Sequence, residues 1–261
     1  MTQASSDRTV KLADGGQMPL VGFGTWQIRG RRGYDAVRSA LAVGYRHIDT
    51  ATFYANEAEV GQAVRDSGVP REDIFITTKL PPDHAGRERA TIEASLRALG
   101  TPYVDLWLIH WPPRRGTSPK LWRELLAAKR GGLARSVGVS NYGTDALDEL
   151  TEATGEAPVV NQIRWSPSLY DAERQAEHRA RGIVLEGYSP FKSTNLRHPV
   201  LTGIAADHDV TAAQVVMRWH IQHEVVAIPK SATPDRIATN FDVFGFELSP
   251  QEMGRIDGMA R

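Results

Sequence analysis

The chain has 261 residues, of which 41% are hydrophobic and 24% charged, so it can bury a sizeable core and is not a disordered chain. Its 31 Lys and Arg residues balance its 31 Asp and Glu residues, which argues against a nucleic-acid partner. It has no cysteine, which excludes disulfides, thiolate nucleophiles and zinc–thiolate sites.

The beginning of the chain, Met1 to Asp7, is polar, and no run of about 18 apolar residues follows it. We therefore expect neither a secretion signal nor a membrane span. A cytoplasmic protein without a membrane partner is the default expectation.

Eight short apolar segments rich in Val and Ile alternate with longer amphipathic segments. The predicted strands are Leu20–Gly24, Arg46–Thr50, Ile74–Leu80, Val104–His110, Ser136–Asn141, Val159–Trp165, Val184–Ser189 and Val225–Lys230. Most of them are continuously apolar, which is typical of parallel strands buried on both faces.

The segments between the strands have the periodicity of helices. The predicted helices are Tyr34–Val43, Glu57–Ser67, Arg87–Leu99, Pro119–Lys129, Thr144–Ala153, Asp171–Ala180, a double stretch over Val200–Gln222, and Pro234–Val243. Several end at a glycine that closes a helix in the left-handed conformation, namely Gly44, Gly68, Gly100, Gly131 and Gly182. Pro234 after Thr233 and Pro250 after Ser249 are typical of helix starts.

Eight β-then-α units with short connections predict an α/β fold, a closed (β/α)8 TIM barrel, which needs roughly 250 residues. Nothing resembles an interdomain linker, so residues 1–261 are expected to form a single domain. The segment Val10–Pro19 predicts an N-terminal β-hairpin that plugs the lower end of the barrel. The segment Glu252–Ala260 predicts an extra C-terminal helix.

A doubly wound sheet is the alternative fold. It needs a glycine-rich phosphate turn after its first strand, but Gly22-Phe23-Gly24 is followed here by Thr25-Trp26-Gln27. The missing pattern favours the barrel.

In parallel barrels, active sites lie at the carboxyl ends of the strands. Asp49 lies at the end of the second predicted strand, Tyr54 follows it, and Lys79 and His110 lie at the ends of the next two. Asp49 alone is explained as a helix cap, Tyr54 as a rim aromatic and His110 as a hydrogen-bonded core histidine. A buried lysine needs an anionic partner, however, and the four residues together indicate a catalytic site.

The chemistry of these four residues is coherent. A tyrosine is a weak proton donor at neutral pH unless its phenolate is stabilised, so we expect Lys79 to lower the pKa of Tyr54. Asp49 is expected to pair with Lys79, and His110 to offer an N–H to a substrate oxygen. Since no histidine pair with ligand spacing lies at a strand end, no metal site is expected.

A proton donor alone reduces nothing, so a hydride source is also expected. Tyr188 can stack on a nicotinamide ring, and Ser140, Asn141 and Gln162 can bind its carboxamide group. For Gln162, a satisfied interior amide is an equally good explanation.

The segment after the last strand predicts a phosphate site. It carries two cations, Lys230 and Arg236, and two hydroxyls, Ser231 and Thr233, around the start of a helix. Such a site suits the additional phosphate of NADPH better than the ribose of NADH.

Several motifs follow one another along the chain. They are Gly22 to Trp26, Gly44 to Ala51, Tyr54 with Asn56-Glu57, Thr78-Lys79-Leu80, His110-Trp111-Pro112, Val137 to Asn141, Asn161-Gln162, Tyr188-Ser189-Pro190 and Ile228 to Ser231. Together they resemble the aldo-keto reductase superfamily from about Lys11 to near Asp257, and are most similar to bacterial members of the 2,5-diketo-gluconate reductase type. This resemblance implies a monomeric enzyme that uses NADPH/NADP+, bound before a small-molecule carbonyl substrate, and reduces aldehydes or ketones.

The resemblance also implies roles for individual residues. Asp49, Tyr54, Lys79 and His110 match the catalytic tetrad, with Tyr54 as proton donor. The residues that match the cofactor site are Ser140, Asn141, Gln162, Tyr188, Ser189, Lys230, Ser231, Thr233, Arg236 and Asn240. The substrate site is expected to include Trp26, Tyr54, His110 and Trp111.

The chain departs from the family pattern at several places. Ile163 to Pro167 follows Gln162 where a Glu and a His-Pro pair are common, Phe191 replaces a common leucine, and Thr239 stands where Glu or Gln often contacts the adenine. The segment from Trp111 to Trp122 is short, and no long tail follows Arg261 to close the pocket. We therefore expect an open substrate site and a broad substrate range.

Two groups of arginines lie in loops predicted at the same rim: Arg29, Arg31 and Arg32, and Arg114 and Arg115. Solvated loop charge explains them. The alternative is that they steer an anionic cofactor or substrate to the mouth.

Two other functions compete with this interpretation. In a Schiff-base aldolase, Lys79 or Lys230 would attack a carbonyl, but the residues that match the cofactor site would then have no role. A non-catalytic nucleotide-sensing barrel is compatible with the fold, although the complete tetrad argues against it.

Overall fold

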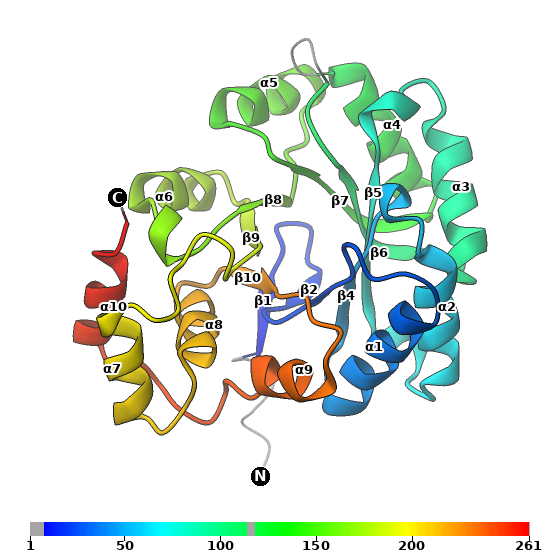
Figure 1. Cartoon of the computed structure of the whole chain (residues 1–261). Coiled ribbons are helices and arrows are strands. Elements are labelled where there is room, and N and C mark those ends of the chain that lie inside the picture. Colours follow the sequence, from blue (N-terminus) through cyan, green and yellow to red (C-terminus); the bar gives the residue numbers. More distant parts are fainter. Residues whose placement is uncertain (1–7, 114–117, 261) are drawn as a thin grey trace.

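A computed structural model describes residues 8–113 and 118–260 of the chain. Eight parallel strands form one sheet in the order β10-β9-β8-β7-β6-β5-β4-β3, so that each strand pairs with the next along the chain (Figure 1). They are β3 (Phe23–Gly24), β4 (His47–Asp49), β5 (Phe75–Leu80), β6 (Val104–Ile109), β7 (Ala134–Ser140), β8 (Val160–Arg164), β9 (Val184–Tyr188) and β10 (Val226–Ile228). All residues of β5 and β6 are buried, as the continuous apolar pattern predicts.

The first and last strands meet and close the ring. Val21 forms a parallel bridge with Ala227, and the amide of Gly22 donates to the Ala227 carbonyl at 2.9 Å. Gly22 is required at this seam, because a Cβ atom there would lie 2.5 Å from Nδ1 of His47. The seam also explains why β3 is shorter than the predicted strand Leu20–Gly24: its first residues pair through an isolated bridge. The predicted (β/α)8 barrel is confirmed.

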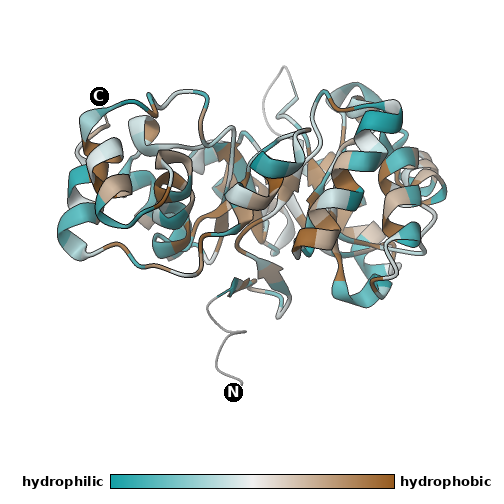
Figure 2. Cartoon of the chain, turned by 60° about the horizontal axis from the view of Figure 1, so that its bottom comes forward, coloured by the Kyte–Doolittle hydropathy of each residue, from teal (hydrophilic) through white to brown (hydrophobic). Residues whose placement is uncertain are grey.

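Helices surround this ring. They are α1 (Gly30–Val43), α2 (Glu57–Asp66), α3 (Glu88–Leu99), α4 (Pro119–Arg130), α5 (Thr144–Thr154), α6 (Ala172–Ala180), α7 (Pro199–Asp207), α8 (Ala212–Gln222), α9 (Pro234–Phe241) and α10 (Pro250–Asp257). Four single 3-10 turns are η2 (Thr52–Tyr54), η3 (Arg71–Asp73), η4 (Pro82–His84) and η5 (Pro167–Leu169). Hydrophobic residues concentrate between strands and helices, and hydrophilic residues on the outer helix faces (Figure 2).

Some helix boundaries differ from the prediction. Helix α1 begins at Gly30 rather than Tyr34, and the Gly30 amide donates to the Glu59 carboxylate at 3.1 Å. Helix α4 ends at Gly131 as predicted, but Gly131 is not left-handed: it has a φ of −80°, and Gly132, with a φ of 74°, takes the left-handed conformation.

The double stretch divides into α7 and α8, and Thr211 caps α8 through a capping box with Gln214. Helix α10 starts before the predicted Glu252 because Ser249 forms a capping box with that residue.

The predicted hairpin is present. Strands β1 (Thr9–Lys11) and β2 (Gln17–Pro19) pair antiparallel, and Figure 1 shows them in the middle of the ring of strands. Leu12 and Met18 are buried, and Asp14 pairs with Lys129 near the end of α4 at 2.7 Å. Since α4 ends where β7 begins, the hairpin covers the amino-terminal end of the barrel, opposite the strand ends that carry the candidate site.

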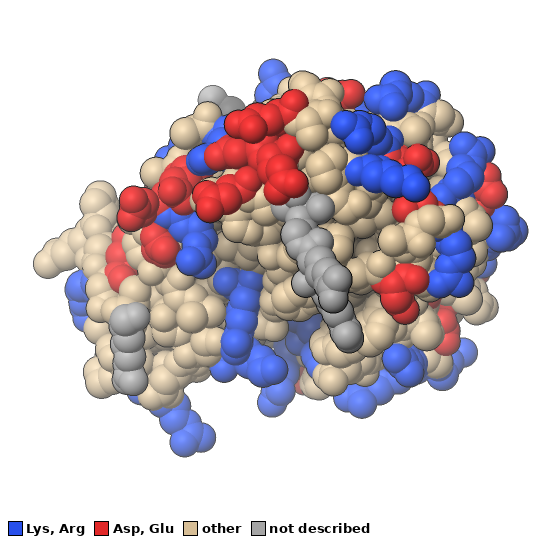
Figure 3. Space-filling view, turned by 90° about the horizontal axis from the view of Figure 1, so that it is seen from above, with Lys and Arg blue, Asp and Glu red and all other residues tan. Residues whose placement is uncertain are grey.

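Among the described residues, every helix is too short or too polar to cross a membrane. Seen from above, most acidic side chains gather in one patch at the upper left of the view, while basic side chains are spread over the rest of this face (Figure 3).

Candidate active site

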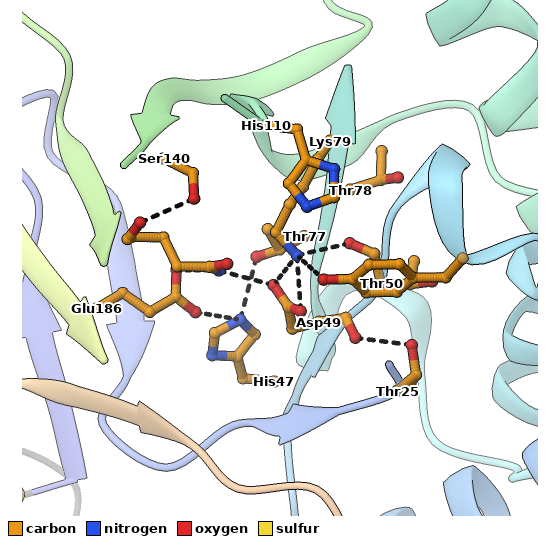
Figure 4. Close-up of polar contacts among 12 residues, drawn as sticks. Thr25, His47, Asp49, Thr50, Thr77, Thr78, Lys79, His110, Ser140 and Glu186 are labelled. Carbon is orange, nitrogen blue, oxygen red and sulfur yellow. Dashed lines mark hydrogen bonds and ion pairs between the residues drawn. The ribbon is translucent and has the colours of Figure 1, made fainter. Parts of the chain in front are cut away.

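Four side chains converge at the carboxyl ends of three neighbouring strands (Figure 4). Asp49 is the last residue of β4, Lys79 lies in β5, and His110 follows β6 directly. Tyr54 ends the short turn η2, which follows β4. The barrel therefore brings the four predicted catalytic residues into one group.

Lys79 is the centre of this group. Its side chain is fully buried, and Nζ donates to both carboxylate oxygens of Asp49 at 2.7 and 2.6 Å and to the Thr50 carbonyl at 2.9 Å. The Tyr54 hydroxyl lies 3.4 Å from the same nitrogen. A buried ammonium is tolerated only with such partners, so Asp49 compensates the charge and leaves Lys79 beside the phenol.

The surroundings shift the pKa values of Lys79 and Tyr54. Burial lowers the pKa of Lys79, but the charge and hydrogen bonds of Asp49 together with the charges of Tyr54 and Glu186 outweigh it, so the pKa is raised and the side chain stays an ammonium. The expectation that the pKa of Tyr54 is lowered is wrong for the protein without a bound ligand, where this pKa is raised. Burial, together with the charges of Asp49 and Glu186, raises the pKa of Tyr54 more than Lys79 lowers it.

The His110 ring lies beside the phenol. Its centroid is 5.6 Å from that of Tyr54, with an angle of 71° between the rings. Burial, and next to it the charge of Lys79, lowers the pKa of His110 to about 3, so the ring is neutral at neutral pH. No group within residues 8–113 and 118–260 forms a hydrogen bond with the ring, which borders a cavity and can donate an N–H into it.

A second set of polar groups lies across the barrel mouth. The Tyr188 hydroxyl, at the end of β9, donates to Oδ1 of Asn141 at 2.9 Å. Nδ2 of Asn141 donates to the His110 carbonyl at 3.2 Å and to Oγ of Ser140 at 2.9 Å. These bonds hold Tyr188 in place beside the cavity that it lines.

Gln162 joins the two sets. Its Nε2 donates to Asp49 at 2.8 Å and to Glu186 at 2.9 Å, and its backbone carbonyl accepts from Ser140 at 2.8 Å. The side-chain nitrogen of Gln162 therefore has its hydrogen-bond partners inside the barrel, as expected for an interior amide. The side chain also lines the cavity.

The predicted phosphate residues lie at the other side of the mouth. Lys230 lines the cavity, and Ser189 at the end of β9 does so too. Ser231, Thr233, Arg236 and Asn240 follow at and within α9 but do not line the cavity. Lys230, Thr233 and Arg236 are exposed, whereas Ser231 and Asn240 are buried.

The cavity has a volume of about 1260 Å³ and extends from Tyr54 to Lys230. Trp26, Phe53 and Trp111 form its outer rim, with exposed fractions of 40%, 62% and 49%. Large exposed aromatics around a concave site are typical of a ligand-binding mouth rather than of a closed core.

The Aldo/keto reductase family model matches residues 20–261. The chain belongs to the aldo/keto reductase family. An aldo-keto reductase of Mycolicibacterium smegmatis is 46% identical over 251 residues, which cover 95% of this chain and 91% of the relative. A morphine 6-dehydrogenase of Pseudomonas putida is 42% identical over 271 residues, with coverages of 97% and 92%. A Bombyx mori aldo-keto reductase, solved in complex with NADP, is 32% identical with a TM-score of 0.91 and coverages of 97% and 92%.

The predicted family is thus confirmed, while the likeness to the 2,5-diketo-gluconate reductase type stays a prediction. In this aldo/keto reductase, two buried residues near Asp49 were missing from the predicted site. Glu186 lies in the middle of β9 and His47 begins β4, and both side chains point into the barrel near Gln162. Neither lies at the carboxyl end of a strand, where a parallel barrel carries its active site, so the strand-end pattern does not mark them.

The backbone at the mouth of this reductase is unusual. Four non-glycine residues there have positive φ angles: Gln27 (61°), Ala55 (52°), Asn141 (66°) and Ser189 (55°). Such conformations cost free energy and cluster at functional sites. Two of these residues, Ala55 and Ser189, directly follow Tyr54 and Tyr188 in the chain.

The arginines predicted to steer anions are partly engaged. Nε of Arg29 donates to the Tyr54 carbonyl at 2.8 Å, and Arg31 pairs with Asp35. Arg32 is exposed, and Arg114 and Arg115 lie outside the described residues. Arg29 therefore supports the loop that carries Tyr54, and the steering role stays a prediction.

Proposed function

We propose that this aldo/keto reductase reduces aldehyde or ketone carbonyls to alcohols with NADPH, and that Tyr54 is the proton donor. Family membership makes it an oxidoreductase. The observation that supports the finer statement is the Tyr54 hydroxyl 3.4 Å from a buried, ion-paired ammonium, on a cavity wide enough for a cofactor and a substrate.

The residues fit a nicotinamide cofactor. The Tyr188 ring borders the cavity and is fixed through Asn141, which suits stacking on a flat ring. Since Nε2 of Gln162 is satisfied by two carboxyl groups, its Oε1 is the group left to accept from a carboxamide. Lys230 at the far end offers a cation to a phosphate, with Arg236 beyond it.

Bound NADPH supplies the hydride for the carbonyl carbon. The Tyr54 hydroxyl gives its proton to the carbonyl oxygen, and its phenolate is left facing the Lys79 ammonium. That ammonium favours the phenolate, and Asp49 keeps Lys79 charged and in place. The neutral His110 ring donates an N–H to the carbonyl oxygen and orients it.

The aromatic residues at the rim of the cavity bear on which substrates the enzyme accepts. Trp26, Phe53 and Trp111 offer apolar faces around a wide opening, which suits large ring-containing carbonyl compounds. The Pseudomonas putida relative, by its name, dehydrogenates morphine, which is a large ring compound. We infer a broad range of carbonyl substrates.

A Schiff-base mechanism fits less well. It needs a neutral amine, but Lys79 is bound by both oxygens of Asp49 and its pKa is raised. Lys230 is exposed at the edge of the cavity, at the opposite end from Tyr54 and His110.

The test is a panel of aldehydes, ketones, diketones and keto-sugars assayed for NADPH oxidation, with NADH in parallel. The proposal expects turnover with several members and a preference for NADPH. Quenching of tryptophan fluorescence by NADPH without turnover on any member would instead support a nucleotide-sensing barrel. Borohydride trapping of substrate on a lysine would support the aldolase.

A further inference from the structure

A second carboxyl group lies inside the barrel, close to the Asp49–Lys79 pair. The Glu186 side chain is completely buried and points toward the His47 ring (Figure 4). Oε1 of Glu186 lies 3.6 Å from Nε2 of His47, and that nitrogen also lies 3.0 Å from the Thr77 hydroxyl. The proposed mechanism gives Glu186 no role, although a fully buried carboxyl group is costly.

The Gln162 amide links this carboxyl group to the catalytic pair. Both N–H groups of Nε2 are used, one on Oδ2 of Asp49 and one on Oε2 of Glu186. Asp49 and Glu186 are therefore two acids that share one amide. A change of charge on Glu186 acts on Asp49 and Lys79 across a short, dry path.

The groups that face Glu186 come from three strands. They are His47 and Asp49 of β4, Lys79 of β5 and Gln162 of β8, while His220 of α8 lies behind β9 against Gly187. Burial and the repulsion of Asp49 raise the pKa of Glu186 to about 8, and burial and Lys79 lower the pKa of His47 to about 3. At neutral pH, Glu186 and His47 are both uncharged, and the ion pair of Asp49 and Lys79 leaves no net charge in this group.

We propose that Glu186 is a positioning residue for the proton donor: through the Gln162 amide it fixes Asp49, and through its own proton it controls the charge that Tyr54 experiences. This inference rests on the proposed function. The proton comes from Tyr54, and Glu186 is not among the residues that line the cavity.

The consequence is a specific pH profile. When Glu186 ionises, its negative charge raises the pKa of Tyr54. Reduction needs the protonated phenol, so its rate falls as the pH rises through the Tyr54 pKa. In the wild-type protein, ionised Glu186 moves this fall to higher pH. Glu186→Gln keeps the shape and the hydrogen bond but cannot ionise, so the fall moves to lower pH by about one unit, which is a tenfold change in Tyr54 ionisation at a given pH.

The experiment measures kcat/KM for reduction between about pH 6 and 10 for three variants and the wild type. Glu186→Gln is expected to shift the basic limb downward, and Glu186→Asp, which keeps an ionisable carboxyl group, to restore most of the wild-type profile. Glu88→Gln is the matched control: Glu88 is also buried, but it accepts from the Gly86 amide outside the barrel and is expected to leave the profile unchanged. Melting temperatures and NADPH affinities separate a shifted profile from general damage.

An active Glu186→Gln with the wild-type profile overturns the inference while leaving the proposed function intact, whereas failure of the wild type on every carbonyl compound refutes the function itself. If Glu186→Gln does not fold, infrared spectroscopy of the wild type and Glu186→Asp gives the second readout. A protonated carboxyl band at neutral pH that disappears on raising the pH supports the inference, and its absence overturns it.

Discussion

Lys79 and Tyr54 show how neighbouring side chains in one site respond differently to the same surroundings. Both are buried, but Lys79 has a carboxylate within 2.7 Å and stays charged, whereas the nearest opposite charge to Tyr54 lies 3.4 Å away and does not offset the burial. The phenol therefore enters the reaction as a protonated donor. Its ammonium neighbour becomes most useful once the proton has left.

At this scale, Asp49→Asn tests the ion pair. The variant leaves the Lys79 ammonium buried without its carboxylate, so the free energy of unfolding is expected to fall by about 3–5 kcal/mol. Urea unfolding of both proteins measures the difference. Asp148→Asn, which breaks the partly exposed pair with Arg181, is the control and is expected to cost less than about 1 kcal/mol. Equal losses in the two variants would show that Asp49 does not compensate a buried charge.

The elements place these groups through strand register. Asp49 of β4 pairs with Thr77 of β5, and Lys79 lies two residues further along on the same face. Strand β10 and helix α9 lie on the far side of the mouth. There Lys230 lines the cavity, and Arg236 is exposed on the first turn of α9. Cations just after a strand and at a helix start favour a phosphate ligand.

Replacing both cations, Lys230→Ala with Arg236→Ala, is expected to weaken NADPH binding about 10- to 100-fold, since two exposed charge pairs contribute about 1 kcal/mol each and about 1.4 kcal/mol is a factor of ten. NADH lacks the additional phosphate, so its affinity should change by less than about threefold by the same reasoning. Fluorescence titration with both cofactors measures this. Arg97→Ala, an exposed arginine of α3, is the control. Equal weakening for NADPH and NADH would place the phosphate elsewhere.

For the whole molecule, the sequence predicted the barrel, the hairpin, and the residues at the strand ends, because alternation of strands and helices marks where each strand stops. Glu186 and His47 were missed because neither lies at the carboxyl end of a strand, and the sequence gives no sign of which inward-facing residues of different strands meet across the barrel. The direction of the Tyr54 pKa was wrong because its burial comes from Trp26 and other residues distant in sequence. These effects depend on tertiary contacts that no local pattern records.

The buried charges also predict a pH dependence of stability. The folded-state pKa of Glu186 is raised to about 8, so the folded chain holds a proton that the unfolded chain has lost. Its contribution is fully present below the unfolded pKa and is lost as the pH rises through about 8. Between about pH 7 and 8, the free energy of unfolding should fall by roughly 1 kcal/mol per pH unit. Urea unfolding at stepped pH measures the slope. Glu186→Gln should flatten it, and an unchanged slope in that variant would contradict the assignment.

The most direct test of the proton donor is Tyr54→Phe, assayed for carbonyl reduction and for NADPH binding in the same preparation. The variant removes one hydroxyl and keeps the ring beside His110, so we expect kcat to fall by about 10²- to 10⁴-fold while the NADPH dissociation constant stays within about twofold of the wild type. Wild-type turnover by Tyr54→Phe would show that the proton comes from another group.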